Sequence, residues 1–142
     1  MKYNIAYGKT GLEFELPDSI RAEVITSTFV PALEHETDAV RAALQNPIDA
    51  PPLKNLAAQS RRIAIVVNDI TRATPYQTIL PALLDELSDV DDDRITLFVA
   101  TGTHRPNTQE ELETMLGPEV LTRFRIIQNE ADDTESHRFV GT

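Results

Sequence analysis

The side chains best suited to chemistry follow two apolar stretches of the sequence. Asp69 and Arg72 come just after the first stretch, and His104 and Arg105 come just after the second. Ligands of open α/β sheets bind beyond the carboxyl ends of the strands. Histidine acts as a general acid or base near neutral pH, and arginine binds carboxylates and phosphates through its guanidinium fork. These residue types predict an anion-binding crevice that contains an acid/base group.

The residues alone leave the roles of the histidine and the aspartate open. His104 is either a general acid/base or a histidine that hydrogen-bonds its own loop. Gly102 favours the first role, because glycine lets a backbone turn sharply or approach a ligand. Asp69 can orient His104, contact a cofactor hydroxyl or form an Asx turn with the loop that follows, and local chemistry favours the turn.

The remaining histidines do not indicate a metal site. His35 lies between two glutamates, which is typical of a solvated surface residue, and nothing in the sequence places His137 at the crevice. The chain has no cysteine, and its three histidines lack the spacing of a metal-binding pair on one helix face. We therefore expect no metal ligands from this chain.

The central half of the sequence alternates between strand and helix patterns. It predicts strands over 62–68, 94–100 and 124–128, and helices over 74–87 and 108–116. Thr74 and Pro75 are expected to start the first helix, while Thr108 and Glu111 form a capping box on the second, which Gly117 ends. This order predicts parallel strands joined by right-handed crossovers.

The N-terminal part of the sequence has a different pattern. Residues 2–7 and 12–16 alternate around a glycine-bounded turn, which predicts a β-hairpin. Helices are expected over 37–44, with Thr37 as the cap, and over 53–58. The predicted fold class is therefore α/β, with a Rossmann-like, mostly parallel sheet flanked by helices and an N-terminal β-hairpin.

Composition limits the environment and the partners. With 142 residues, 41% of them hydrophobic, the chain predicts a single compact unit. Its formal net charge of −10 opposes binding to nucleic acids and to anionic membrane surfaces. No signal-type or membrane-spanning run is present, so we expect a cytoplasmic protein. Near its end the sequence predicts a short strand at 137–140, and we expect it to be the front part of a longer protein.

Two motifs taken together resemble a known family. Asn68-Asp69-Ile70-Thr71-Arg72-Ala73-Thr74-Pro75, followed by Ala100-Thr101-Gly102-Thr103-His104-Arg105-Pro106, resembles the N-terminal domain of the lactate racemase family. Residues 46–48, 108–117 and 132–133 add to the resemblance, which covers the chain from about residue 40 onward. Each motif alone is a weak signal, but both in order at two strand ends are fairly specific.

The resemblance implies a reaction and a cofactor. Members of this family invert a carbon that bears a hydroxyl next to a carboxylate, and they use a nickel-pincer nucleotide. A hydride passes transiently to the cofactor's pyridinium ring while a histidine removes the hydroxyl proton. By motif match, His104 is one of two such histidines, and Arg72 lies near the substrate carboxylate. Arg105 is expected to bind the substrate as well, because its guanidinium fork suits a carboxylate. The implied cofactor contacts are Asp69, Ile70, Thr71 and Arg72.

The resemblance also implies that part of the active site lies elsewhere. In the family, the second histidine, the lysine that holds the cofactor and the nickel-binding histidine follow the region that matches this chain. We therefore expect residues 1–142 to be a single N-terminal domain, inactive alone, whose partners are a 2-hydroxyacid and the C-terminal catalytic half. Ala73 replaces a common proline, and Asn129-Glu130 replaces a common His-Asp pair.

Two other functions fit the residues. The first is a non-catalytic domain that binds a nucleotide or small anion through Arg72 and Arg105. The second is a structural interaction domain, which would bind no ligand and would present an exposed apolar face.

Overall fold

The computed structural model describes residues 2–141, and the chain divides into two compact units rather than the one we expected. The first unit ends at Ala32 and the second begins at Leu33. The stretch before the boundary has no regular secondary structure, and its large apolar side chains, such as Ile25 and Phe29, are exposed. The stretch therefore buries little apolar surface of its own.

The first unit is the predicted β-hairpin. Strands β1 (Lys2–Ile5) and β2 (Leu12–Glu15) pair antiparallel, and the rings of Tyr3 and Phe14 stack with centroids 5.6 Å apart. Gly11 closes the turn with a φ of +78°, and a Cβ there would lie 2.7 Å from an oxygen of Asn4. The turn therefore requires glycine at this position.

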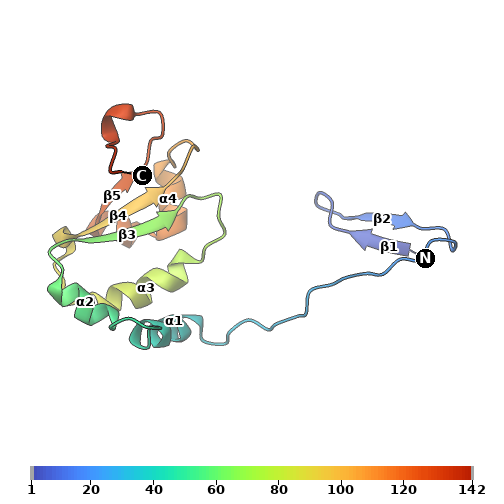
Figure 1. Cartoon of the computed structure of the whole chain (residues 1–142), viewed down its shortest axis with the longest axis horizontal. Helices are drawn as coiled ribbons and strands as arrows, with labels where there is room; N and C mark the ends of the chain where they lie inside the picture. The colour runs from blue at the N-terminus through green and yellow to red at the C-terminus, as the bar shows by residue number, and fades with distance from the viewer. Residues whose placement is uncertain (1, 142) are drawn as a thin grey trace. The chain divides into compact units, whose positions relative to one another are not determined.

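The second unit contains the predicted parallel sheet. Strands β3 (Ile63–Asn68), β4 (Ile95–Ala100) and β5 (Arg125–Gln128) lie in the order β3-β4-β5 and all run parallel (Figure 1). In the register, Asn68 is paired with Ala100. The loops after β3 and β4 therefore start side by side, as expected for a shared rim.

Helices connect the strands of the sheet and cover one of its two faces. Their bounds are α1 Glu36–Gln45, α2 Leu53–Gln59, α3 Tyr76–Glu86, α4 Gln109–Leu116 and α5 Pro118–Arg123. Short 3-10 turns occupy Asp92–Arg94 and Thr134–Ser136. Figure 1 shows α3 beneath the sheet with α1 packed beside it, while the segment after β5 rises on the other side. This arrangement confirms the α/β class.

The core lies between the sheet and these helices. Its most deeply buried large side chains come from β3, β4, helix α3 and the residue that follows α3. They are Val67, Leu80, Leu87, Ile95, Leu97 and Val99. The opposite face of the sheet is not covered in the same way. Val66 is 68% exposed and Phe98 is 38% exposed.

Two of the predicted helix starts were wrong. The first helix begins at Glu36, so Thr37 lies in its first turn instead of capping it, and Glu36 and Asp38 place negative charge at the positive end of the helix dipole. Helix α3 begins at Tyr76 with Pro75 at its N-cap, and the hydroxyl of Thr74 does not cap it but accepts a hydrogen bond from the Asn68 side chain 2.8 Å away.

Helix α4 follows the prediction closely. Thr108 and Glu111 form the capping box, and Gly117 follows the helix with a φ of +88°. The pattern did not reveal α5, which begins with Pro118 directly after that glycine. The strand expected at 137–140 is absent, since those residues pair with no strand in the described part of the chain. No helix among residues 2–141 is long and apolar enough to span a bilayer.

Candidate functional site

A crevice lies at the carboxyl ends of β3 and β4. It has a volume of about 340 Å³, and its lining comes from the two loops that the sequence singled out: Asn68, Asp69, Arg72, Ala100, Thr101, Gly102, Thr103 and His104. The parallel register at Asn68 and Ala100 brings these loops together. The predicted rim is therefore present in the fold.

Asp69 and His104 meet inside this crevice. The Nδ1 atom of His104 lies 2.6 Å from Oδ2 of Asp69, although the two residues are 35 positions apart. The aspartate is buried at 4% exposure, whereas the histidine side chain is 52% exposed. The pair thus has a fixed inner partner and an outer partner that solvent or a ligand can reach.

The other oxygen of Asp69 bonds its own loop. Its Oδ1 accepts from the Thr71 hydroxyl at 2.6 Å and from the Thr71 backbone N–H at 3.3 Å. The Thr71 hydroxyl, and then the His104 imidazole, hold the pKa of Asp69 below its usual range. Two of the alternatives for Asp69 are therefore both realised: it forms the Asx turn and it contacts His104.

The geometry sets the chemistry of the histidine. A carboxylate only accepts hydrogen bonds, so Nδ1 of His104 is the donor and carries the ring proton when the imidazole is neutral. Among the described residues, Nε2 has no hydrogen-bond partner. Its lone pair is then available to take a proton from a ligand, which is the arrangement of a general base.

Arg72 supplies a positive charge that no side chain among residues 2–141 neutralises. It lines the crevice, and within residues 2–141 its guanidinium forms neither a hydrogen bond nor an ion pair. Only its backbone N–H is used, donating to the Asp69 carbonyl at 3.2 Å. The fork is therefore free to bind a carboxylate or phosphate.

The guanidinium of Arg105, which we expected to bind an anion, is paired with a carboxylate of the protein. Its two terminal nitrogens each lie 2.8 Å from an oxygen of Glu111, in a two-pronged ion pair, and one also donates to the Pro106 carbonyl at 2.9 Å. The side chain is not part of the crevice lining. The structure therefore gives Arg105 a role at the start of α4 and does not bring it to the predicted anion site.

Ile70 and Thr71 offer few groups to a cofactor. The Ile70 side chain packs against the core and its backbone N–H donates to Asn107, while the Thr71 hydroxyl already bonds Asp69. Of the four residues expected to contact a cofactor, Arg72 is the one whose charged group remains unused.

Sequence reasoning missed a buried amide network beneath the crevice. Oδ1 of Asn107 accepts from the Ile70 N–H at 3.1 Å, and its Nδ2 donates to Gln128 at 3.0 Å. The Oε1 atom of Gln128 also accepts from the Asn107 backbone N–H at 2.7 Å, and its Nε2 atom donates to the Asn107 carbonyl at 2.9 Å. The network joins the loops after β3 and β4 to the end of β5, and only the position of Asn107, three residues after His104, hinted at it.

A second group of contacts holds the loop of Gly102. The Thr101 hydroxyl donates to the Asn129 carbonyl, and the Asn129 side chain donates to the Gly102 carbonyl at 3.0 Å. His137 in turn lies 3.0 Å from Asn129 through Nε2 and 2.7 Å from the Asp133 carbonyl through Nδ1. His137 thus lies beside the loop that borders the crevice, which the sequence did not indicate.

The donor set suits an anion better than a metal. In the described part of the chain, no group of three or more His, Asp or Glu side chains could hold a metal ion. A Cβ added at Gly102 would meet nothing within 4 Å, so a flat or phosphorylated group can approach that backbone beside Arg72. The crevice therefore offers an anionic group one unpaired guanidinium and an open stretch of backbone among the described residues.

Comparisons with known proteins point to one family. Residues 7–142 match the model of the lactate racemase N-terminal domain. The chain is 32% identical to the lactate racemase of Thermoanaerobacterium thermosaccharolyticum over 97% of its own length, and 37% identical to that of Lactiplantibacillus plantarum over 75%. It spans 33% and 25% of the lengths of these two proteins.

Solved structures agree with the sequence matches. The lactate racemase apoprotein from Thermoanaerobacterium thermosaccharolyticum superposes with a TM-score of 0.85 and 31% identity, over 100% of this chain and 33% of that one. A protein from Thermotoga maritima superposes with a TM-score of 0.56 and 22% identity, over 75% of this chain and 24% of that one, and shows the likeness of fold alone.

Proposed function

This chain belongs to the lactate racemase N-terminal domain family, and from that premise we propose that it is the N-terminal domain of a longer 2-hydroxyacid racemase or epimerase. Its crevice would be completed by a C-terminal part of the same polypeptide, and the 142-residue chain alone would be inactive. The observation that carries the proposal is the 2.6 Å contact between His104 and Asp69 beside the unpaired Arg72.

His104 would act on the substrate hydroxyl. Its Nε2 accepts the hydroxyl proton, and the Asp69 carboxylate stabilises the positive charge that the ring then carries through the bond to Nδ1. The resemblance to the family implies a second histidine that serves the other face of the carbon. Since neither His35 nor His137 lines the crevice, the second group would come from outside the described residues.

Arg72 would bind the carboxylate of the substrate. A chain with a formal net charge of −10 repels small anions in general, so a free guanidinium is needed to hold one beside His104. A two-pronged contact would also fix the orientation of the acid, with its hydroxyl on the side of His104 in the same crevice. Arg105 is excluded from this proposal because Glu111 occupies its fork.

The same crevice would hold part of a nickel-pincer nucleotide. When bound, this group supplies the hydride acceptor that inversion of a hydroxyl-bearing carbon needs. Arg72 and the open backbone at Gly102 are the features of this chain that would contact it. The nickel ligands and the covalent attachment would come from the rest of the polypeptide.

The proposal is tested in the complete protein by replacing His104 with alanine. Racemisation of a 2-hydroxyacid, followed by chiral chromatography, is expected to be abolished while cofactor and nickel remain bound. His35→Ala is the matched control, because His35 is an exposed residue before α1. Full activity in His104→Ala would refute the assignment.

The unpaired Arg72 also favours a second function, a non-catalytic domain that binds a small anion. Calorimetry of the 142-residue chain with phosphate and with lactate measures this directly. Binding that is lost in Arg72→Ala, in a complete protein without racemase activity, would support the binding domain over the racemase. Binding that survives the loss of both Arg72 and Arg105 would exclude it.

A further inference from the structure

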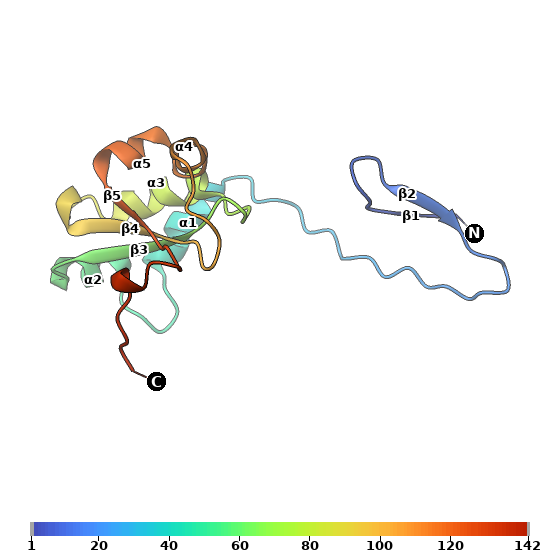
Figure 2. The ribbon, with the colours of Figure 1, turned by 90° about the horizontal axis from the view of Figure 1, so that it is seen from above.

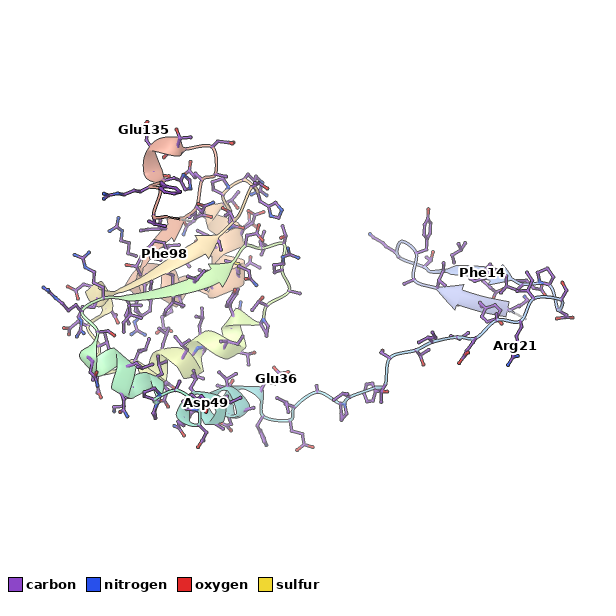
Figure 3. All side chains as sticks on the ribbon, viewed as in Figure 1. Phe14, Arg21, Glu36, Asp49, Phe98 and Glu135 are labelled. Carbon is purple, nitrogen blue, oxygen red and sulfur yellow. The ribbon has the colours of Figure 1, made fainter. Side chains whose placement is uncertain are left out.

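The face of the sheet turned away from α3 is an unpartnered apolar surface, which we call the open face. Val66, Phe98 and Ile127 are register partners and form one row across β3, β4 and β5. Val66 is 68% exposed and Phe98, labelled in Figure 3, is 38% exposed. Parallel sheets are normally covered on both faces, and a large exposed apolar surface marks an interaction site.

The open face already has polypeptide leading onto it. A cavity of about 510 Å³ is lined by Phe98 and Ile127 on the sheet side and by Asp133, Ser136 and His137 from the segment after β5. Figure 2 shows this segment in front of the sheet, with its last described residues beyond β3. The chain therefore passes from the edge of β5 toward the edge of β3 on the open side.

Hydrogen bonds fix the path of the segment that follows β5. His137 bonds Asn129 at 3.0 Å and the Asp133 carbonyl at 2.7 Å, and Asn129 bonds the Gly102 carbonyl at 3.0 Å. The direction in which the polypeptide leaves the sheet is thus fixed by the loop after β4.

The handedness of the connections determines what can follow. Crossovers between parallel strands are right-handed, so steps from β3 to β4 and from β4 to β5 place their helices on the same face. A right-handed crossover that passes over the open face must therefore lead from β5 back toward β3. Because β4 already pairs with one edge of β3, the next strand has to pair with the other edge of β3, which is free among the described residues.

We infer that the open face is the docking surface for a helix of the polypeptide that follows residue 142 in the complete protein, and that this helix leads to a strand paired with the free edge of β3. The inference rests on the proposed function, in which this chain is the N-terminal domain of a longer racemase. The matched relatives are long enough to supply both elements, since the chain spans 33% and 25% of their lengths.

The added strand would also change the surroundings of the crevice. Reversal of strand order at β3 would create a topological switch point at its carboxyl end, which is where open α/β sheets bind ligands. Asp69 and Arg72 follow that end directly. A second copy of the chain is a poorer occupant of the open face, because a formal net charge of −10 on each copy opposes pairing.

Cysteine labelling tests the docking surface, since the 142 residues contain no cysteine. Val66→Cys reports on the open face, and Glu110→Cys on the exposed side of α4 is the matched control. Maleimide labelling of both is followed by mass spectrometry in the 142-residue chain and in the complete protein, with any later cysteines changed to serine. We expect Val66→Cys to react like the control in the short chain and at least tenfold more slowly in the complete protein.

Each other outcome overturns the inference in a recognisable way. Equal labelling of Val66→Cys in both proteins means that nothing covers the face. Protection of Val66→Cys in the short chain together with a doubled molecular mass means that a second copy covers the face. Protection without a doubled mass means that the short chain covers the face by itself. Phe98→Cys repeats the test should Val66→Cys fail to fold.

Hydrogen exchange tests the predicted strand. The β3 amides that do not bond β4 should exchange rapidly in the short chain and slowly in the complete protein. Rapid exchange in both refutes the added strand. None of these measurements uses racemase activity, so failure of the proposed function would be seen separately, as a complete protein that protects Val66→Cys but does not racemise 2-hydroxyacids.

Discussion

The crevice and the start of α4 each contain an arginine and an acid, yet they use them in opposite ways. At α4, Arg105 and Glu111 satisfy each other through two 2.8 Å contacts that also complete a capping box. In the crevice, Asp69 is satisfied by its own loop and by His104, which leaves Arg72 without a partner among the described residues. An internally paired charge holds a fold together, whereas a charge left unpaired at a strand end is available to a ligand.

After the abolition of activity expected from His104→Ala, the largest effect is expected from Asp69→Asn. An amide can donate to Nδ1 of His104, which turns the ring proton onto Nε2 and removes the base from the crevice. In the complete protein, kcat for racemisation should fall by roughly 10²- to 10⁴-fold, the usual contribution of general acid/base catalysis. Asp93→Asn, an exposed acid outside the crevice, is the control. An unchanged kcat in Asp69→Asn would show that this pair is not used in the reaction.

The two arginines provide an intermediate effect and a direct contrast. Arg72→Ala should raise KM for the 2-hydroxyacid by roughly 10- to 100-fold, as expected for loss of hydrogen bonds between charged groups, without lowering Tm. Arg105→Ala should lower Tm and leave KM nearly unchanged, because it removes the partner of Glu111 and not a crevice group. If the two variants exchanged these behaviours, the assignment of binding and structural roles would be reversed.

The smallest effect concerns the pH dependence of stability at α4. The Arg105 guanidinium, followed by the Thr108 backbone N–H, lowers the pKa of Glu111 from 4.5 to about 2. A carboxyl group with a lowered pKa in the folded state stabilises the protein fully above its unfolded pKa and loses this contribution as the pH falls toward the folded value. The stabilisation should therefore be complete above about pH 4.5 and be lost between there and about pH 2.

Glu111→Gln should remove this dependence. Melting curves between pH 2 and pH 6 are expected to show a smaller loss of Tm on acidification in Glu111→Gln than in the unchanged protein. Glu110→Gln, an exposed neighbour in the same helix turn, should retain the original slope. Equal slopes in all three proteins would mean that the pair of Arg105 and Glu111 contributes no net stability, as many surface ion pairs do.

The sequence predicted those features that depend on neighbouring residues. Thr108 and Glu111 are three positions apart, so their capping box is a local pattern, and the alternation of apolar stretches indicated three parallel strands. The same pattern brought Asp69 and His104 to one rim, because parallel strand ends meet at the same edge of a sheet. Local chemistry could not show that both oxygens of Asp69 are used.

What the sequence did not predict depends on contacts between distant residues. The partners of Asn107 lie 37 and 21 positions away, so no local pattern reveals the network that ties the crevice loops to β5. The fork of Arg105 looked available because Glu111 was already explained by its capping role. Thr74 suits a helix cap by residue type, but the fold brings the Asn68 side chain to its hydroxyl instead.

The tautomer of His104 tests the central claim most directly, because the proposed base depends on which ring nitrogen carries the proton. In ¹⁵N-labelled protein at a pH where the ring is neutral, NMR should show a protonated Nδ1 and an unprotonated Nε2 for His104. Asp69→Asn should abolish this preference. A proton on Nε2 in the unchanged protein would contradict the account, because the crevice would then hold a donor where the reaction requires a base.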